Sequence, residues 1–225
     1  MIERRMNQII QLLKTNVLYY ESAMKQLTTY IDILDNELKT LNGKTPINYV
    51  TTRVKKPESI IEKLKRKKLP LNMNSIDELT DIVGARIVVD FIDNIYVVID
   101  KLKENKNIKI INEKDYIKNH KDSGYRGYHI IIEIPTYVNG LMKNVKCEIQ
   151  IRTLAIDSWA SNEHKLNYKK SSIDQETKNI LKETAEEIWN VDTKMNELYK
   201  KNKNDVNKNT LEDLPFINIL NNRRN

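Results

Sequence analysis

A carboxylate, an amide and a guanidinium alternate along the segment 145–153. Glu148, Gln150 and Arg152 occupy every second position, and the residues between them are apolar. Successive side chains of a strand point to opposite faces of its sheet, so one face can join the core while the other presents these polar groups. The groups suit a metal ion, a polar base edge and a phosphate. The alternative is that they face water, as the outer face of an antiparallel sheet often does.

A second set of polar residues surrounds an expected helix start at Pro57. Arg53 and Lys55 alternate along an extended lead-in, and Ser59 and Lys63, four residues apart, share one face of the helix that follows. Free backbone amides at a helix start, together with a hydroxyl and cations, bind phosphate. The segment therefore indicates a phosphate site, with a solvated basic helix as the alternative.

Asp81, Gly84 and Arg86 lead directly into an apolar strand. A carboxylate at the mouth of a strand, beside a glycine that permits close approach, is a common ligand for a hard cation such as Mg²⁺. The planar guanidinium of Arg86 can stack on a base or bind phosphate. The alternative is a helix-terminal aspartate paired with a nearby cation.

A glycine-punctuated loop over residues 114–129 concentrates aromatic and cationic side chains, including Lys114 and Lys121. Tyr125 lies among small and cationic residues, so it is a good stacking platform for a nucleobase. His129 opens the next strand, where it can bond a phosphate or a hydroxyl. For each of these residues taken alone, the alternative to nucleotide binding is a purely structural role.

The sequence lacks the motifs of several other sites. No Ser/His/Asp arrangement indicates nucleophilic catalysis, and three histidines with one cysteine are too few for a dedicated zinc site. There is neither a Walker glycine loop nor a Gly-x-Gly-x-x-Gly motif. Nucleotide chemistry, if the chain performs it, must use another arrangement.

Composition and charge limit the class of protein. The 225 residues are 40% hydrophobic, enough for one domain with extensions or two small ones. A net charge of +7 favours polyanionic partners such as nucleotides, nucleic acid or a membrane surface. No stretch approaches the roughly 18 apolar residues of a membrane span, and no signal peptide is present. We expect a soluble, cytoplasmic protein, with Cys147 as a buried core thiol.

Apolar periodicity predicts the elements that position these residues. Apolar side chains recur at helical spacing over 2–41 and again over 174–202, so a long helix is expected near each end. Between them we expect a mixture of strands and helices: strands at 85–91, 108–111, 128–137 and 145–153, and helices at 58–68, 95–104 and 154–167.

Two local signals mark the middle of the chain. Asn139-Gly140 predicts a tight hairpin between the strands on either side. Ser75 with Glu78 predicts a capping box for a short helix, which Gly84 closes.

In this order, the polar segments resemble the synthetase domain of the RelA/SpoT-type alarmone enzymes. The resemblance covers about residues 47–168, and the flanking helices are similar to those of the small, single-domain alarmone synthetases. Five collinear motifs carry it: Arg53-x-Lys55-x-x-x-Ser59-x-x-x-Lys63, Asp81-x-x-Gly84-x-Arg86, Asp115-Tyr116-Ile117 with Lys121, Gly124-Tyr125 with His129, and Glu148-Ile149-Gln150-Ile151-Arg152-Thr153 followed by Trp159-Ala160 and Glu163-His164.

The resemblance implies an α/β (α+β) fold, in which a nucleotidyltransferase-like mixed β-sheet is flanked by helices and by long N- and C-terminal helices. The expected regions are an N-terminal helical extension (1–46), a synthetase domain (47–170), a C-terminal helix (171–202) and a polar, flexible tail (203–225).

The implied reaction transfers the pyrophosphate of ATP to the 3′-hydroxyl of GDP or GTP, making the alarmones ppGpp and pppGpp of the stringent response and releasing AMP. Asp81 and Glu148 would hold Mg²⁺, and Glu148 would help to deprotonate the 3′-hydroxyl. ATP would be bound by Arg53, Lys55, Ser59, Lys63 and Arg86, with the two arginines on either side of adenine. GDP or GTP would be bound by Lys114, Lys121, Tyr125, His129 and Gln150, with Tyr125 stacked on guanine.

Three positions in the acceptor loop depart from the family pattern. Gly127 stands where serine is common, which removes a hydroxyl and would loosen the loop. His120 replaces the usual proline, and Ser123 stands where asparagine is frequent. The preference among GMP, GDP and GTP is therefore left open.

The resemblance also bears on partners. Small members are often homotetramers built through terminal helices, so a homo-oligomer is expected here. An alarmone or RNA is the expected allosteric ligand, and alarmone contacts would fall at Tyr49 and Thr51. The chain contains no His-Asp dipeptide, which marks the hydrolase domain of large members, so we expect synthesis without hydrolysis.

Two other functions use the same residues. A non-catalytic, RNA-binding regulatory protein would use the basic and aromatic surface, although Asp81 and Glu148 would repel RNA phosphates. A nucleotidyltransferase that moves a nucleotidyl group is the other alternative, and the pattern around Tyr125 and His129 disfavours it.

Overall fold

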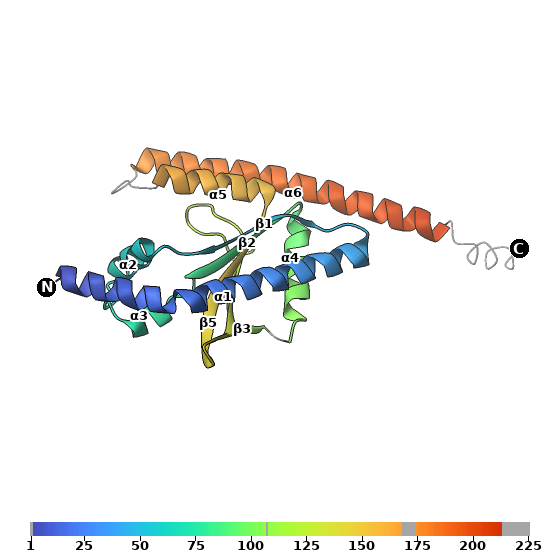
Figure 1. Ribbon diagram of the computed structural model, residues 1–225. Coiled ribbons are helices and arrows are strands. Elements are labelled where there is room, and N and C mark those ends of the chain that lie inside the picture. The colour runs from blue at the N-terminus through green and yellow to red at the C-terminus, as the bar shows by residue number, and fades with distance from the viewer. Residues whose placement is uncertain (1, 107, 168–173, 213–225) are drawn as a thin grey trace, which may run out of the picture.

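A mixed sheet lies between two long helices (Figure 1). The computed structural model describes residues 2–106, 108–167 and 174–212. None of the helices in these ranges is both long and apolar enough to pass through a bilayer. In chain order the elements are α1 (Ile2–Asn42), β1 (Ile47–Val54), α2 (Pro57–Arg66), α3 (Met73–Asp77), β2 (Val83–Val89), α4 (Ile92–Lys103), β3 (Lys109–Asp115), β4 (Tyr128–Val138), β5 (Leu141–Thr153), α5 (Leu154–Asn167) and α6 (Gln175–Glu212).

The five strands lie in the order β1-β2-β5-β4-β3. β2 and β5 are parallel, and the other neighbouring strands are antiparallel. The mixed sheet and the long terminal helices confirm the predicted fold class. β1 was expected only as an extended lead-in, and its pairing with β2 makes it an edge strand of the sheet. The alternating strand β5 lies at the centre, so its polar side chains have neighbours on both sides.

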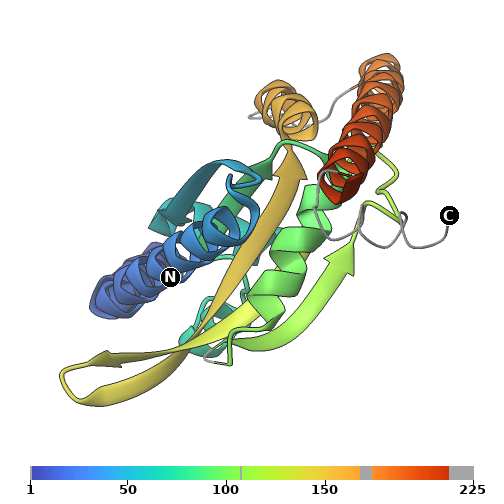
Figure 2. The same cartoon turned by 90° about the vertical axis from the view of Figure 1, so that its right-hand side faces the viewer.

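The hairpin between β4 and β5 is confirmed. Asn139 and Gly140 have φ angles of 51° and 77°, and two consecutive positive φ angles define the turn that matches the twist of a two-residue hairpin. Figure 2 shows this hairpin extending beyond the body of the sheet. It aligns the two strands along their whole length, which sets the register of the residues near their other ends.

α1 and α4 cover one face of the sheet. α1 contacts β1, β2, β4 and β5, and α4 contacts α1, β2 and β5. The buried side chains of α1 recur at helical spacing, so they form one stripe along the helix. On β5 the residues that join this core are Val145, Cys147, Ile149 and Ile151. The strand therefore has one apolar face in the core, and its alternate side chains point away from α1.

The short helix before β2 differs from the prediction. Asn72, not Ser75, caps α3, because the Asn72 side chain accepts a hydrogen bond from the Ser75 backbone N–H at 2.9 Å. The helix ends at Asp77, and Gly84 lies inside β2 rather than closing a helix. The predicted capping box is thus wrong, since an earlier residue provides the cap. Asp81 consequently lies on the short lead-in to a central strand.

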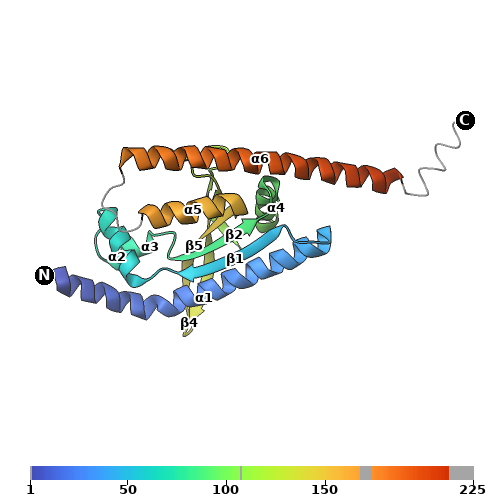
Figure 3. The same cartoon turned by 90° about the horizontal axis from the view of Figure 1, so that it is seen from above.

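α5 has the predicted bounds, and α6 is longer than predicted. α6 was expected to end near residue 202, whereas it continues to Glu212, so the boundary of the expected tail at 203 is wrong. Residues 213–225 lie outside the described residues. The two long helices α1 and α6 lie on opposite sides of the sheet (Figure 3), and α5 lies between the sheet and α6.

Candidate active site

One row of side chains crosses the whole sheet on the face turned away from α1. From β1 to β3, the register aligns Thr51, Arg86, Gln150, His129 and Lys114. The next row aligns Arg53, Gly84 and Glu148. Side chains in direct register on one face lie about 5 Å apart at their Cβ atoms. The residues predicted for ATP on β1 and β2 therefore meet those predicted for the acceptor on β3 and β4, with β5 between them.

A cleft opens on this face over β1, β2 and β5. It is lined by Thr51, Thr52, Arg53, Asp81, Gly84, Ala85, Arg86, Glu148 and Gln150. Gly84 lies between Arg53 and Glu148, where any larger side chain would occupy the cleft. The structure thus brings the two arginines predicted for adenine together with the two carboxylates predicted for the metal.

Asp81 is held by two lysines from the basic segment. Its Oδ2 lies 2.5 Å from Nζ of Lys55, and its Oδ1 lies 2.6 Å from Nζ of Lys63. Burial opposes ionisation of this carboxyl, but the two lysines outweigh it and hold the pKa of Asp81 below its usual range. Asp81 is therefore an anion at neutral pH, and it gathers the cations predicted to bind the ATP phosphates.

Glu148 is partly buried and is fixed by two hydrogen bonds. The Nε2–H of Gln150 donates to Oε2 at 2.8 Å, and Nδ1 of His129 lies 3.3 Å from Oε1. Burial opposes ionisation of Glu148, but these hydrogen bonds outweigh it, so its pKa lies below the usual range. Burial also lowers the pKa of His129, which is therefore neutral at pH 7 and donates through Nδ1–H.

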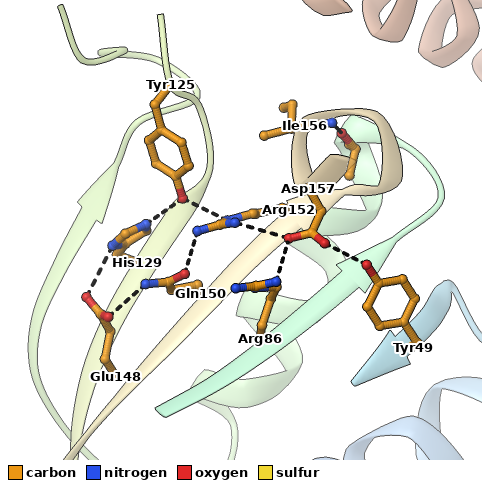
Figure 4. A network of polar contacts seen from close by, with 10 residues as sticks. Tyr49, Arg86, Tyr125, His129, Glu148, Gln150, Arg152, Ile156 and Asp157 are labelled. Carbon is orange, nitrogen blue, oxygen red and sulfur yellow. Dashed lines mark hydrogen bonds and ion pairs between the residues drawn. The ribbon is translucent and has the colours of Figure 1, made fainter. Parts of the chain in front are cut away.

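These contacts close into a ring of five residues (Figure 4). Nε–H of Arg152 donates to the hydroxyl of Tyr125 at 2.9 Å, and that hydroxyl donates to Nε2 of His129 at 2.7 Å. On the other side, Nη2–H of Arg152 donates to Oε1 of Gln150 at 2.6 Å. Because the ionised Glu148 carboxylate can only accept, the proton of neutral His129 is on Nδ1, and Nε2 accepts from the Tyr125 hydroxyl. The ring therefore fixes both the orientation and the protonation of Glu148 and its neighbours.

Arg152 is a structural cation rather than a phosphate ligand. Its side chain is only 9% exposed, and Nη1 forms an ion pair with Asp157 at 3.1 Å. Asp157 also contacts Nη1 of Arg86 at 3.2 Å and accepts from the Tyr49 hydroxyl at 2.6 Å. Sequence reasoning missed Asp157, although an acidic residue in the first turn of the helix after β5 was a usable signal. It orients Arg86 at the edge of the cleft.

The carboxylates of Asp81 and Glu148 suit a hard cation. They line the same cleft, and the negative charge of Asp81 opposes ionisation of Glu148, so the two groups are close enough to interact. The described residues contain no group of three or more His, Cys, Asp or Glu side chains that could hold a metal. Two carboxylates leave ligand positions for phosphate oxygens and water, which is how Mg²⁺ is commonly bound beside a nucleotide.

The predicted acceptor residues also converge, but Tyr125 is not exposed. Its side chain is buried, and the ammonium of Lys121 lies 4.6 Å from its ring centroid and 4.7 Å from that of Tyr116. His129 packs edge-on against both rings. Stacking of Tyr125 on a base therefore requires Lys121 to leave the ring. Lys114 lies at the exposed end of the same row.

Gly127 does not loosen the acceptor loop. It is buried, its φ is +150°, and a Cβ at this position would lie 2.7 Å from the Tyr125 hydroxyl. A serine here would displace that hydroxyl from its place between Arg152 and His129. The glycine is therefore required for this packing of the loop.

On the donor side, Ser59 and Arg53 are exposed, as substrate-binding residues on a rim would be. No side chain caps the start of α2, where Lys56 is extended and Pro57 follows. The first amides of α2 thus remain available beside Ser59. The geometry agrees with a phosphate site.

Comparison with known proteins decides the family. Residues 52–173 match the family described as the region found in RelA / SpoT proteins. The chain belongs to the RelA/SpoT family. GTP pyrophosphokinase YwaC of Bacillus subtilis is 40% identical to it over 184 residues, which cover 81% of this chain and 88% of that protein.

Solved structures of family members have the same fold. Small alarmone synthetase 1 from Bacillus subtilis, bound to its product pppGpp, has a TM-score of 0.79 at 35% identity, with 85% of this chain and 98% of that chain covered. Small alarmone synthetase 2 from the same organism has a TM-score of 0.75 at 40% identity, with 84% and 98% covered. The likeness extends well beyond the family segment, and the terminal helices lie largely outside that segment.

Proposed function

We propose that this chain is a GTP pyrophosphokinase, which transfers the β,γ-pyrophosphate of ATP to the ribose 3′-hydroxyl of GDP or GTP. The 3′-oxygen forms a bond to the β-phosphorus, the bond from that phosphorus to the bridging oxygen of the α-phosphate breaks, and AMP leaves with that oxygen. The observation that carries the proposal is that Asp81 and Glu148 line one cleft, with two lysines held at Asp81 and with His129 beside Glu148. The names of the relatives support the same reaction.

The donor side supplies charge neutralisation. Lys55 and Lys63 are held at Asp81, so both ammonium groups stay near the position where triphosphate oxygens would lie. Arg53 and Arg86 line the same cleft and offer planar cations for adenine. Pyrophosphoryl transfer needs alignment and charge stabilisation more than covalent chemistry, and these side chains provide both.

The acceptor side supplies the base. Glu148 is ionised and its oxygens are oriented by His129 and Gln150, so it can accept the proton of the 3′-hydroxyl. Asp81 and Glu148 would hold Mg²⁺, which when bound would neutralise phosphate charge. Tyr125 and Lys121 would bind guanine and its phosphates after Lys121 moves off the ring.

The other expectations about partners remain part of the proposal. The 225 residues contain no His-Asp dipeptide, which supports synthesis without hydrolysis. An apolar stripe on α6 supports self-association, with a homotetramer as the expected state. Tyr49 is partly engaged by Asp157, so an allosteric alarmone at Tyr49 and Thr51 would be close to Arg86.

The RNA-binding alternative is less well supported. The cleft that holds the basic residues also holds Asp81 and Glu148, both anionic at neutral pH. Carboxylates in a nucleic-acid groove repel phosphate, whereas they are required where a metal is bound.

A transfer assay tests the proposal. Purified protein is incubated with γ-labelled ATP and Mg²⁺, and with GMP, GDP or GTP in separate reactions. Label should move onto a guanine nucleotide, Glu148→Gln should abolish the transfer, and chelation of Mg²⁺ should do the same. Glu133→Gln is the matched control, because Glu133 is on β4 and pairs with Lys109 away from the cleft. If no guanine nucleotide gains label, the proposed reaction is excluded.

A further inference from the structure

The acceptor loop is fastened to α6 by a residue that points away from the cleft. Arg126 lies between Tyr125 and Gly127, and its side chain is only 7% exposed. Its Nη2–H groups donate to both carboxylate oxygens of Glu186, at 3.1 and 3.0 Å, and Nη1 donates to the carbonyl of Gly124 at 3.2 Å. Its guanidinium also lies 4.7 Å from the ring centroid of Trp189. Both protein partners outside the loop are on α6.

The loop backbone is in close contact with the same helix. Gly124 has a φ of +83°, and a Cβ there would lie 2.6 Å from the Cβ of Ala185. Tyr125 and Ala185 belong to one small apolar cluster that also contains Trp159 and Ala160. Nε1–H of Trp159 donates to the carbonyl of Leu181 at 3.1 Å. Close packing and directed hydrogen bonds therefore act together at this contact.

The position of Tyr125 depends on this contact. A buried guanidinium without its carboxylate is strongly unfavourable, so Arg126 stays buried only while Glu186 faces it. Lys121 is tied to the same turn, because its backbone N–H donates to the carbonyl of Tyr125 at 3.1 Å. A shift of α6 at Glu186 would consequently move both predicted acceptor residues of the loop.

The donor side has other supports. Arg53 and Lys55 are on or next to β1, which packs on α1 and β2, and Lys63 is on α2, which packs on α1 and α3. The main contacts of α6 are with α4 and α5. A change in the fit between α6 and the loop should therefore affect binding of the acceptor more than binding of ATP.

We propose that α6 positions the acceptor nucleotide through the Arg126–Glu186 pair, and that Arg126 is a positioning residue for that substrate. This rests on the proposed function. It gives α6, which starts beyond the matched family segment, a direct role in the site. The helix also links the acceptor loop to the surface on its outer side, so a molecule bound there would act on acceptor binding.

Steady-state kinetics of Glu186→Gln, with GTP and ATP varied separately, test the proposal. The substitution keeps the size of the side chain and removes its charge, so the KM for GTP should rise about tenfold, which is the usual effect of losing a charge-assisted hydrogen bond. The KM for ATP should stay within about twofold, because Lys55 and Lys63 are held at Asp81, away from the pair at Glu186. Glu186→Asp keeps the charge and should recover part of the loss.

Glu183→Gln is the matched control. Glu183 is an exposed residue one turn earlier on α6, so its substitution should leave both KM values unchanged. Equal losses for ATP and GTP in Glu186→Gln, or an unchanged KM for GTP, would overturn the proposal. Transfer by the wild-type protein is measured first, so failure of the proposed reaction is separate from failure of the positioning role.

Hydrogen exchange of the wild-type chain tests the same coupling without any substitution. Addition of GTP should slow exchange at the amides of residues 181–189 of α6 as well as at residues 121–129 of the loop, because the two are one packed unit. Protection of the loop with no change in α6 would overturn the proposal, even where the variants fold poorly.

Discussion

At the scale of single residues, Glu148 combines burial with ionisation. Burial opposes ionisation of Glu148, yet hydrogen bonds from His129 and Gln150 keep the carboxylate ionised and fix its orientation. Both donors are held in turn, His129 by the Tyr125 hydroxyl and Gln150 by Arg152. If Glu148 is the base, as proposed, its activity should be sensitive to residues that never touch substrate.

The Tyr125 hydroxyl and the Tyr125 ring should have separable effects. Tyr125→Phe keeps the ring and removes the hydroxyl that donates to His129, so kcat should fall by roughly tenfold with the acceptor KM little changed. Tyr125→Ala also removes the ring predicted to stack on guanine, so the acceptor KM should rise. Steady-state kinetics at saturating ATP measure both.

Tyr137→Phe is the control for this pair, because it makes the same change at an exposed position near the hairpin tip. Full kcat in Tyr125→Phe would show that the hydroxyl does not support Glu148. An unchanged acceptor KM in Tyr125→Ala would show that guanine stacks elsewhere.

At the scale of elements, β5 separates a core face from a polar face that lines the cleft. Cys147, Ile149 and Ile151 are fully buried against the helices, while Glu148 and Gln150 line the cleft. The rigidity of the buried face is what fixes the carboxylate, since a central strand with neighbours on both sides cannot shift without breaking the sheet. The buried face offers a direct probe of this rigidity.

The thiol of Cys147 should resist modification in the folded protein. Burial raises the pKa of this thiol to about 12. At pH 8, four units below that value, only roughly one thiol in ten thousand would be ionised, and the thiolate is the reactive form. We expect no reaction with a thiol-specific disulfide reagent until denaturant is added, and full reaction afterwards. Rapid stoichiometric reaction of the native protein would show that the sheet opens at β5.

At the scale of the whole molecule, α6 has one side packed on the loop and another side that exposes apolar residues. One side receives Arg126 through Glu186 and packs on the acceptor loop. The other leaves Val191 and Leu198 59% and 55% exposed, together with Met195. Such a stripe is unusual on a monomer and is typical of a surface that pairs with another helix.

The exposed stripe should mediate self-association. In Val191→Glu with Leu198→Glu, the charges should prevent apolar pairing, so the mass by light scattering should fall below that of the wild type. The fold should survive, since both side chains are exposed, and thermal unfolding checks this. Asn190→Glu, which adds the same charge at an exposed position about 100° around the helix from Val191, is the control. An unchanged mass in the double variant would place the interface on another surface.

Local patterns were sufficient for much of the fold. Asn139-Gly140 fixed the hairpin because both residues tolerate positive φ, and the alternation at 145–153 fixed which side chains of β5 enter the core. The bounds of α5 were also predicted, and the long helices followed from periodicity. By contrast, β1 and the cap at Asn72 were missed, since pairing with β2 and competition between caps are not visible in periodicity.

Long-range contacts account for what was missed at the site. Arg126 and Glu186 are 60 residues apart, and Tyr49 and Asp157 are 108 residues apart, so no local pattern connects them. Arg126 is visible in the sequence between Tyr125 and Gly127, but the sequence does not show that its side chain points away from the cleft.

The sequence by itself determined the chemistry available to this protein: the carboxylates, the basic donor segment and the aromatic acceptor loop, each on an element set by local periodicity. Only the tertiary structure decided which of these groups meet. It buried Arg152 and Tyr125 in a ring behind Glu148 and bound the acceptor loop to α6. The physical reason is that side-chain type and spacing are properties of a segment, whereas burial, hydrogen-bond partners and free energy of ionisation depend on segments brought together by folding.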